Sequence, residues 1–113
     1  MSSRDIKLLL EDMHEACGKI SSYTLGLSFG EFLSDGKTID AVVRNYEIVG
    51  EAAARVSEEF RMTHPEIEWR KITAFRNRII HEYFGIDYEV LWKIKEINIP
   101  ELSERLSMIL EEL

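Results

Sequence analysis

Apolar side chains recur every three or four residues through most of this chain, which is the period of an amphipathic α-helix rather than of a strand. The first such segment predicts a helix over about Arg4–Thr24, capped by Ser2 or Ser3. Its apolar stripe consists of Ile6, Leu9, Leu10, Met13, Cys17, Ile20 and Thr24. Within this stripe, Cys17 is interpreted as a small core hydrophobe rather than a reactive thiol.

The middle of the chain predicts a loop followed by a long helix. Residues 26–37 combine three glycines with serines and an aspartate, which is typical of a loop, here with one short turn at Phe29–Leu33. A helix is expected over about Thr38–Met62. Its core stripe consists of Val42, Tyr46, Val49, Ala53, Val56 and Phe60. A lighter stripe beside it consists of Val43, Gly50, Ala54 and Ser57.

The small side chains of the lighter stripe predict the close approach of another helix. Gly50 in mid-helix costs roughly 1 kcal/mol relative to alanine, so its presence points to a packing requirement. The approaching helix can belong to the same chain or to a second subunit.

The second half of the chain predicts three more helices. The His64-Pro65 pair ends the preceding helix because a residue before proline avoids the helical region. The expected helices cover about Ile67–Tyr83, from the N-cap Asp87 to about Ile97, and Pro100–Leu113. Gly85 follows the first of these as a stop signal. The predicted fold is all-α: one domain over residues 1–113, an antiparallel bundle of four main helices plus a short C-terminal helix.

Composition narrows the class of protein. The 113 residues are 45% hydrophobic and 31% charged, which excludes a disordered chain, and no apolar run is long enough to span a membrane. The first residues lack the apolar segment of a secretory signal, so a cytoplasmic location is expected. The single cysteine excludes an intrachain disulfide, and the three histidines are too far apart in sequence to suggest a metal site. No cofactor is predicted.

Charge is distributed unevenly along the sequence. The net charge of -7 argues against a protein that grips nucleic acid over a broad surface. Residues 69–78, however, carry four basic side chains and no acid, enough for a local contact with phosphate. The alternative for this segment is an ordinary solvated helix face.

One arginine breaks the pattern of the helix predicted over Ile67–Tyr83. On a helical wheel, Arg76 falls within the apolar arc formed by Ile72, Phe75, Ile79 and Tyr83. A charged group there is costly unless it is paired or faces a cavity, and such violations often mark functional sites. Alternatively, Arg76 snorkels past the core or pairs with an acid such as Glu51. Since Glu51 lies opposite the core stripe of its helix, that pairing requires the Arg76 helix to pack elsewhere, or a second chain.

The residues around Arg76 are suited to phosphate chemistry. His81 lies one turn after Asn77 and near Arg78, although about 140° from Arg76 on an ideal helix. Histidine moves protons near neutral pH, arginine holds a phosphate, asparagine orients, and Tyr83 can donate a hydrogen bond or stack on a base. These groups suffice for metal-free RNA cleavage by the 2′-hydroxyl. A two-fold dimer would supply a second histidine, whereas a lone histidine here would be structural or solvated.

The spacing Arg76-x4-His81-x-Tyr83 resembles the Arg-x4-His-x-Tyr signature of HepT-type toxins of the HEPN superfamily. The resemblance extends over roughly residues 4–113. It includes Gly50-Glu51-Ala52 after Arg44-Asn45, Trp69 ahead of the motif, Phe84-Gly85-Ile86-Asp87, and Ile99-Pro100-x-Leu102.

The resemblance implies a helical homodimer with ribonuclease activity on RNA and a shared cleft. It also implies a partner, an MNT-type nucleotidyltransferase antitoxin that attaches AMP to the motif tyrosine, here Tyr83. Arg76 would stabilise the phosphate and His81 would shuttle protons, with Asn77 and Arg78 in support.

Two other hypotheses compete with a ribonuclease. The first is a non-catalytic HEPN interaction module that binds a nucleotidyltransferase partner or a nucleotide, which the net charge of -7 favours. The second is a plain structural bundle in which the motif is a coincidence.

Overall fold

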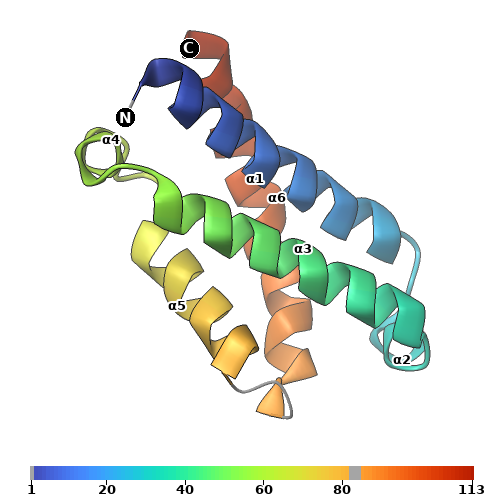
Figure 1. Ribbon diagram of the computed structural model, residues 1–113. Helices are drawn as coiled ribbons and strands as arrows, with labels where there is room; N and C mark the ends of the chain where they lie inside the picture. Colours follow the sequence, from blue (N-terminus) through green and yellow to red (C-terminus); the bar gives the residue numbers. More distant parts are fainter. Residues whose placement is uncertain (1, 82–84) are drawn as a thin grey trace.

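The computed structural model describes residues 2–81 and 85–113, and at Ile80 and His81 only the backbone. This part of the chain forms α-helices and no strand, which confirms the all-α prediction. Four helices are long and two are short (Figure 1). In chain order they are α1 (Ser3–Thr24), α2 (Phe29–Leu33), α3 (Gly36–Arg55), α4 (Glu58–Thr63), α5 (Trp69–His81) and α6 (Tyr88–Glu112).

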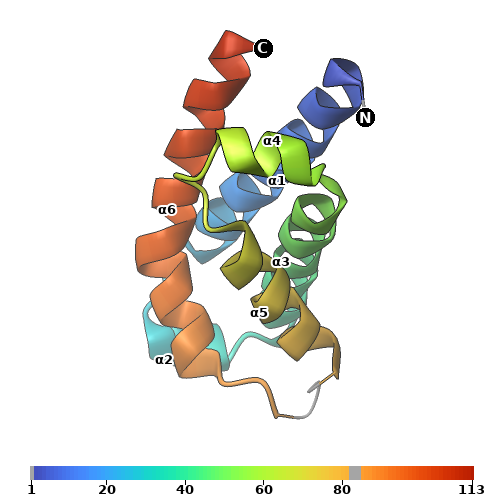
Figure 2. The same ribbon diagram turned by 90° about the vertical axis from the view of Figure 1, so that its left-hand side faces the viewer.

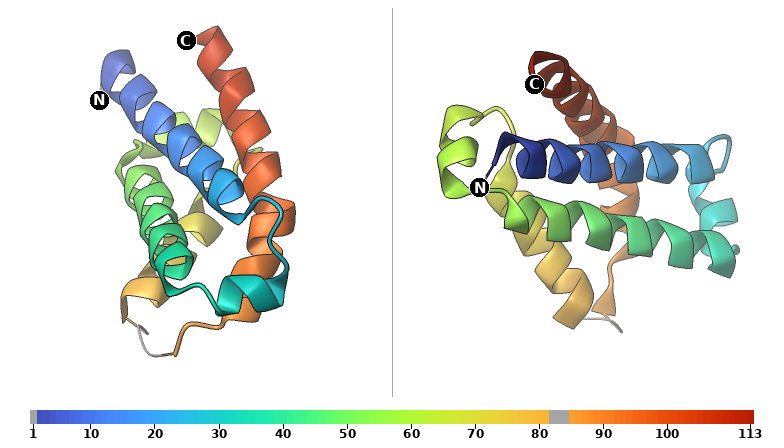
Figure 3. Two further views of the ribbon diagram at one scale, coloured as in Figure 1. Left: turned by 90° about the vertical axis from the view of Figure 1, so that its right-hand side faces the viewer. Right: turned by 45° about the horizontal axis from the view of Figure 1, so that its top comes forward.

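The helices are arranged around α3. Helices α1 and α3 lie side by side and antiparallel, and α5 packs on α3 while α6 packs on α1 (Figures 1 and 3). A quarter turn shows α5 between α3 and α6, with α4 at one end of the bundle and α2 at the other (Figure 2). Helix α1 begins and α6 ends at the α4 end of the bundle, whereas the described part of α5 ends at the opposite end.

Local capping signals explain the first two helices. The Ser2 side chain caps α1 by accepting a 3.2 Å hydrogen bond from the Asp5 N–H, as predicted. The short turn predicted at Phe29–Leu33 is α2, which begins with a reciprocal capping box between Ser28 and Glu31.

The single helix predicted over Thr38–Met62 is wrong, because the segment forms two helices, α3 and α4. The Ser57 side chain accepts a hydrogen bond from the Phe60 N–H and so starts a new helix. Arg61 then reaches back and donates a 2.6 Å hydrogen bond to the Ala53 carbonyl near the end of α3. The same carbonyl also accepts the Val56 N–H at 3.3 Å, so Arg61 adds a second hydrogen bond that ties α4 to the end of α3.

The break predicted between Ile97 and Pro100 is also wrong, because α6 runs through both residues. Asp87 is its N-cap, as predicted, and accepts from the backbone N–H of Glu89. Pro100 lies inside α6 on its exposed face. The carbonyl that loses its helical donor belongs to Glu96, another exposed residue, so water can replace the missing hydrogen bond. The predicted short C-terminal helix is therefore the second half of α6.

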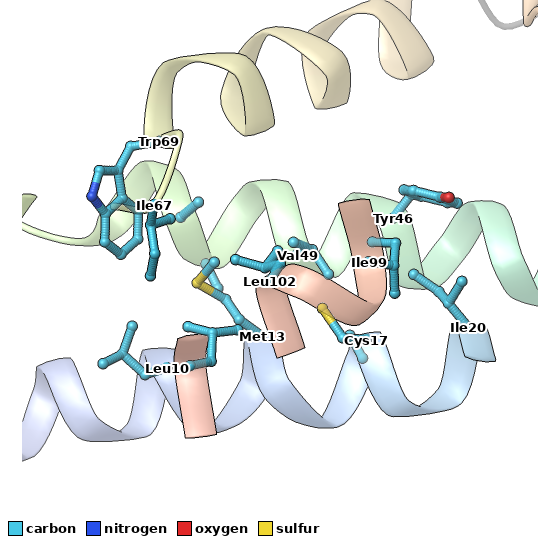
Figure 4. Close-up of a cluster of buried hydrophobic side chains, with 14 of the residues drawn as sticks. Leu10, Met13, Cys17, Ile20, Tyr46, Val49, Ile67, Trp69, Ile99 and Leu102 are labelled. Carbon is cyan, nitrogen blue, oxygen red and sulfur yellow. The ribbon is translucent and has the colours of Figure 1, made fainter. Parts of the chain in front are cut away.

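The core lies where α1, α3 and α6 meet (Figure 4). The figure labels Leu10, Met13, Cys17 and Ile20 from α1, Tyr46 and Val49 from α3, and Ile99 and Leu102 from α6. Cys17 is fully buried, as its place in the stripe predicted, and burial raises the pKa of its thiol to about 12. The Tyr46 hydroxyl donates a 2.9 Å hydrogen bond to the Leu91 carbonyl and thereby links α3 to α6.

Trp69 fixes the start of α5. Its indole is buried, and its Nε1–H donates a 3.0 Å hydrogen bond to the His64 carbonyl at the end of α4. The Phe60 ring lies edge-on to it, with 6.4 Å between the ring centroids. Helix α5 begins here rather than at Ile67, and these contacts anchor the helix that carries the motif.

Candidate active site

The site is built where α5 crosses α3. An alanine methyl built on Gly50 of α3 would lie only 2.1 Å from Cβ of Arg76 and 2.4 Å from its Cγ. The glycine therefore permits an approach that no other residue allows at this backbone separation. The close approach predicted for the lighter stripe is confirmed, and the approaching helix belongs to the same chain.

Glu51 is the ionic partner of Arg76. Its Oε1 lies 3.9 Å from the Arg76 Nη2, and the two side chains are 43% and 30% exposed. Because Cβ and Cγ of Arg76 pack on Gly50, the rest of the Arg76 side chain reaches the flank of α3 where the next residue lies. The pairing considered from the sequence is thus made within one chain.

Asn77 holds the other side of the same guanidinium. The Arg76 Nη1 donates a 3.1 Å hydrogen bond to the Asn77 Oδ1. Neighbouring residues of a helix do not share a face, so the wheel gave no sign of this contact. It forms because the arginine side chain is long and flexible enough to bring its guanidinium to the next residue.

The Arg76 Nε is buried and has no hydrogen-bond partner among the described residues. Burying an unpaired donor is costly, so stable packing in the rest of the fold must hold this side chain in place. The Arg76 side chain as a whole is 30% exposed, so the Nη hydrogens that are not donated to Asn77 can contact an anion. A planar guanidinium with a pair of Nη donors is the group that binds phosphate oxygens in a two-point contact.

The remaining motif residues follow along α5 toward its end. Asn77 and Arg78 are exposed. His81 is the last described residue of α5 and lies one turn after Asn77, so these two positions share a helix face. The proposed modification target, Tyr83, lies outside the described residues. Arg76, Asn77 and Glu51 are therefore the side chains that the structure brings together.

The exposed start of α5 extends the positive charge along the helix. Arg70 is exposed and forms no ion pair within the described part of the chain. Lys71 pairs with Glu68 at 2.6 Å, and this contact raises the pKa of Lys71 and lowers that of Glu68. The cationic character predicted for residues 69–78 is thus partly neutralised.

Two hollows border α5 on sides that do not include the Arg76 guanidinium. A groove of about 220 Å³ between α5 and α6 is mainly apolar, with Phe75, Ile94 and Leu102 in its wall. A wider hollow of about 570 Å³ lies between α4 and α5, bordered by Met62 and Arg70. Neither is lined by Arg76 or Asn77. Within the described residues, no group of three or more metal-binding side chains is placed around a common point.

A bundle of four long helices, with an Arg-x4-His motif at the end of α5, defines an all-helical domain of the HEPN class. The described helices include none that is long and apolar enough to cross a membrane.

Comparison with known proteins places the chain within that class. The profile of the family described as "Ribonuclease HepT-like" matches residues 13–109. The chain belongs to this family.

Relatives of the chain cover its length. A "probable ribonuclease HepT" of Thermococcus cleftensis is 44% identical over 100 residues, which are 88% of this chain and 91% of that protein. A "putative RNase" of Methanocaldococcus jannaschii is 35% identical over 109 residues, 96% of this chain and 100% of that protein. A similarly named protein of Caldanaerobacter subterraneus subsp. tengcongensis is 36% identical over 103 residues, 91% and 92% of the two chains. No solved structure matches the sequence.

Proposed function

We propose that this protein is a metal-independent RNA endonuclease that acts as the toxin of a toxin–antitoxin pair. The observation that carries the proposal is the Arg76 guanidinium, held at the α3–α5 crossing in a side chain that is 30% exposed, five residues before His81. Family membership and the names of the relatives support it. RNA is the proposed substrate, and no cofactor is required.

The proposed reaction is a transesterification. The ribose 2′-oxygen attacks the adjacent phosphorus, the bond from phosphorus to the 5′-oxygen breaks, and a cyclic phosphate and a 5′-hydroxyl result. His81 accepts the 2′-hydroxyl proton, and a second histidine returns a proton to the departing 5′-oxygen. Arg76 stabilises the charge that grows on the phosphate oxygens, with Asn77 and Arg78 in support.

A homodimer is proposed because each chain has only one histidine in the motif. His81 of the partner subunit would complete the acid–base pair in a shared cleft. The proposed antitoxin is an MNT-type nucleotidyltransferase that transfers AMP to Tyr83 and so silences the site. This pair is expected to act in the cytoplasm.

Cleavage in the presence of EDTA tests the proposal. Purified protein without antitoxin should cut total RNA and leave cyclic phosphate ends, while His81→Ala should be inactive yet folded. Cutting at the wild-type rate by the His81→Ala protein would overturn the assignment of the site.

The second candidate is a non-catalytic module that binds a nucleotidyltransferase or a nucleotide. The net charge of -7 and the carboxylate beside Arg76 favour it, since both weaken attraction to RNA. Growth arrest on expression that Arg76→Ala or His81→Ala relieves would support the ribonuclease instead. An unmodified, folded dimer that cuts no RNA would support the module.

A further inference from the structure

We infer that Glu51 is a positioning residue of this site, which holds the Arg76 guanidinium in the orientation that meets the reacting phosphate. The inference rests on the proposed function and adds a residue outside the Arg-x4-His-x-Tyr motif. Glu51 acts through Arg76 and does not itself touch the substrate.

The guanidinium is oriented by polar side chains of two helices. Asn77 of α5 accepts from Nη1 at 3.1 Å, and Glu51 of α3 attracts Nη2 at 3.9 Å. The start of the Arg76 side chain is fixed separately by its contact with Gly50. With Glu51 removed, the distal end of the side chain would be attached to α5 alone, through the neighbouring residue.

The length of the ion pair matters for the chemistry. Hydrogen bonds from nitrogen to oxygen extend to about 3.2 Å, so at 3.9 Å Glu51 attracts Arg76 without accepting its hydrogens. The Nη2 donors therefore stay available for a phosphate oxygen. A closer carboxylate would occupy them.

The charge of Glu51 predicts an effect on turnover that differs from its effect on binding. A carboxylate beside the arginine repels the RNA phosphate in the ground state, so Glu51→Gln should leave KM unchanged or lower it. The same change releases the guanidinium, so kcat should fall about tenfold because less charge stabilisation is in place in the transition state. A carboxylate that merely repelled RNA would give a lower KM with an unchanged kcat.

A second pair of variants separates positioning from a general change in charge or stability. Glu15→Gln makes the same change in net charge on α1, where Glu15 pairs with Lys19 at 3.4 Å, and should leave both constants unchanged. In an Arg76→Ala background, Glu51→Gln should cause no further loss, because the residue through which it acts is gone.

The experiment is steady-state cleavage of a fluorescent RNA in EDTA by the wild type and these variants, together with 15N NMR of the Arg76 guanidinium. Slow Nη rotation in the wild type that becomes fast in Glu51→Gln, with kcat lowered, supports the inference. The inference is overturned if Glu51→Gln leaves kcat unchanged or leaves the Nη rotation unchanged. It is also overturned if Glu51→Gln lowers kcat by the same factor in the Arg76→Ala background. If the wild type cuts no RNA, the proposed function fails, whereas the NMR comparison still shows whether Glu51 restrains Arg76.

Discussion

Gly50 lies directly against the stem of Arg76, closer than any residue with a side chain could lie. This contact sets the separation of α3 and α5 and decides where the guanidinium emerges. It also explains why an arginine occupies the apolar arc of α5. The Cβ and Cγ of Arg76 pack on Gly50, while its guanidinium reaches Glu51.

Gly50→Ala should destabilise the fold even though alanine favours a helix. The added methyl would overlap Arg76, and such overpacking costs about 1–3 kcal/mol. Urea unfolding would measure the change. Gly18 in α1 gives the matched control, because nothing lies within 4 Å of its position, so Gly18→Ala should stabilise by up to about 1 kcal/mol. Equal effects of the two substitutions would contradict the close contact.

Arg76→Lys should show that geometry, and not charge alone, supports cleavage. Lysine keeps the positive charge but lacks the planar pair of Nη donors, so kcat should fall about 100-fold, as when an oxyanion donor is lost. The unfolding midpoint should change little, because lysine removes the buried, unpaired Nε but also loses the hydrogen bond to Asn77. Activity within twofold of the wild type would show that cleavage does not depend on the paired Nη donors of Arg76.

Pro100→Ala should stabilise the protein by about 1–3 kcal/mol, because α6 is continuous there and alanine restores the hydrogen bond to the Glu96 carbonyl. Thermal unfolding followed by circular dichroism would measure it. If Pro100 instead began a separate helix, the substitution would be neutral or destabilising, since proline suits a first turn.

The buried thiol of Cys17 should make stability fall in alkali. Its pKa is raised to about 12 in the folded protein, so between pH 9 and 12 the unfolded chain loses a proton that the folded chain keeps. The contribution of the neutral Cys17 thiol to the free energy of unfolding is fully present below pH 9. Above pH 9 it decreases by about 1.4 kcal/mol per pH unit. Urea midpoints between pH 8 and 10 should show a steeper decline for the wild type than for Cys17→Ala. Equal slopes would mean that the thiol is not desolvated.

How far the sequence predicted the fold depended on whether the signals were local. Helices α1 and α2 were predicted closely because periodicity and caps agree there. At Ser57 the two signals conflict: the apolar period continues to Phe60, but the serine starts a new helix. Pro100 was misread because its tolerance inside α6 depends on solvent exposure, which only the packed structure determines.

In the candidate site, too, the sequence predicted the local features but not those that depend on how the helices pack. The spacing of Arg76 and His81 is visible in the sequence, and the small lighter stripe correctly indicated a close helix contact. Which helix fills it, and hence whether Glu51 meets Arg76, depends on how α5 crosses α3. A helical wheel treats each helix alone and cannot supply that angle.

The position of the two chain ends has a practical consequence. Both lie at the α4 end of the bundle, whereas α5 carries the motif toward the opposite end (Figures 1 and 2). A purification tag, a fluorophore or a tether to a surface attached at either end would lie at the end of the bundle away from the motif. Single-molecule assays, and assays with the protein held on a surface, can therefore be set up without changing a residue inside the sequence.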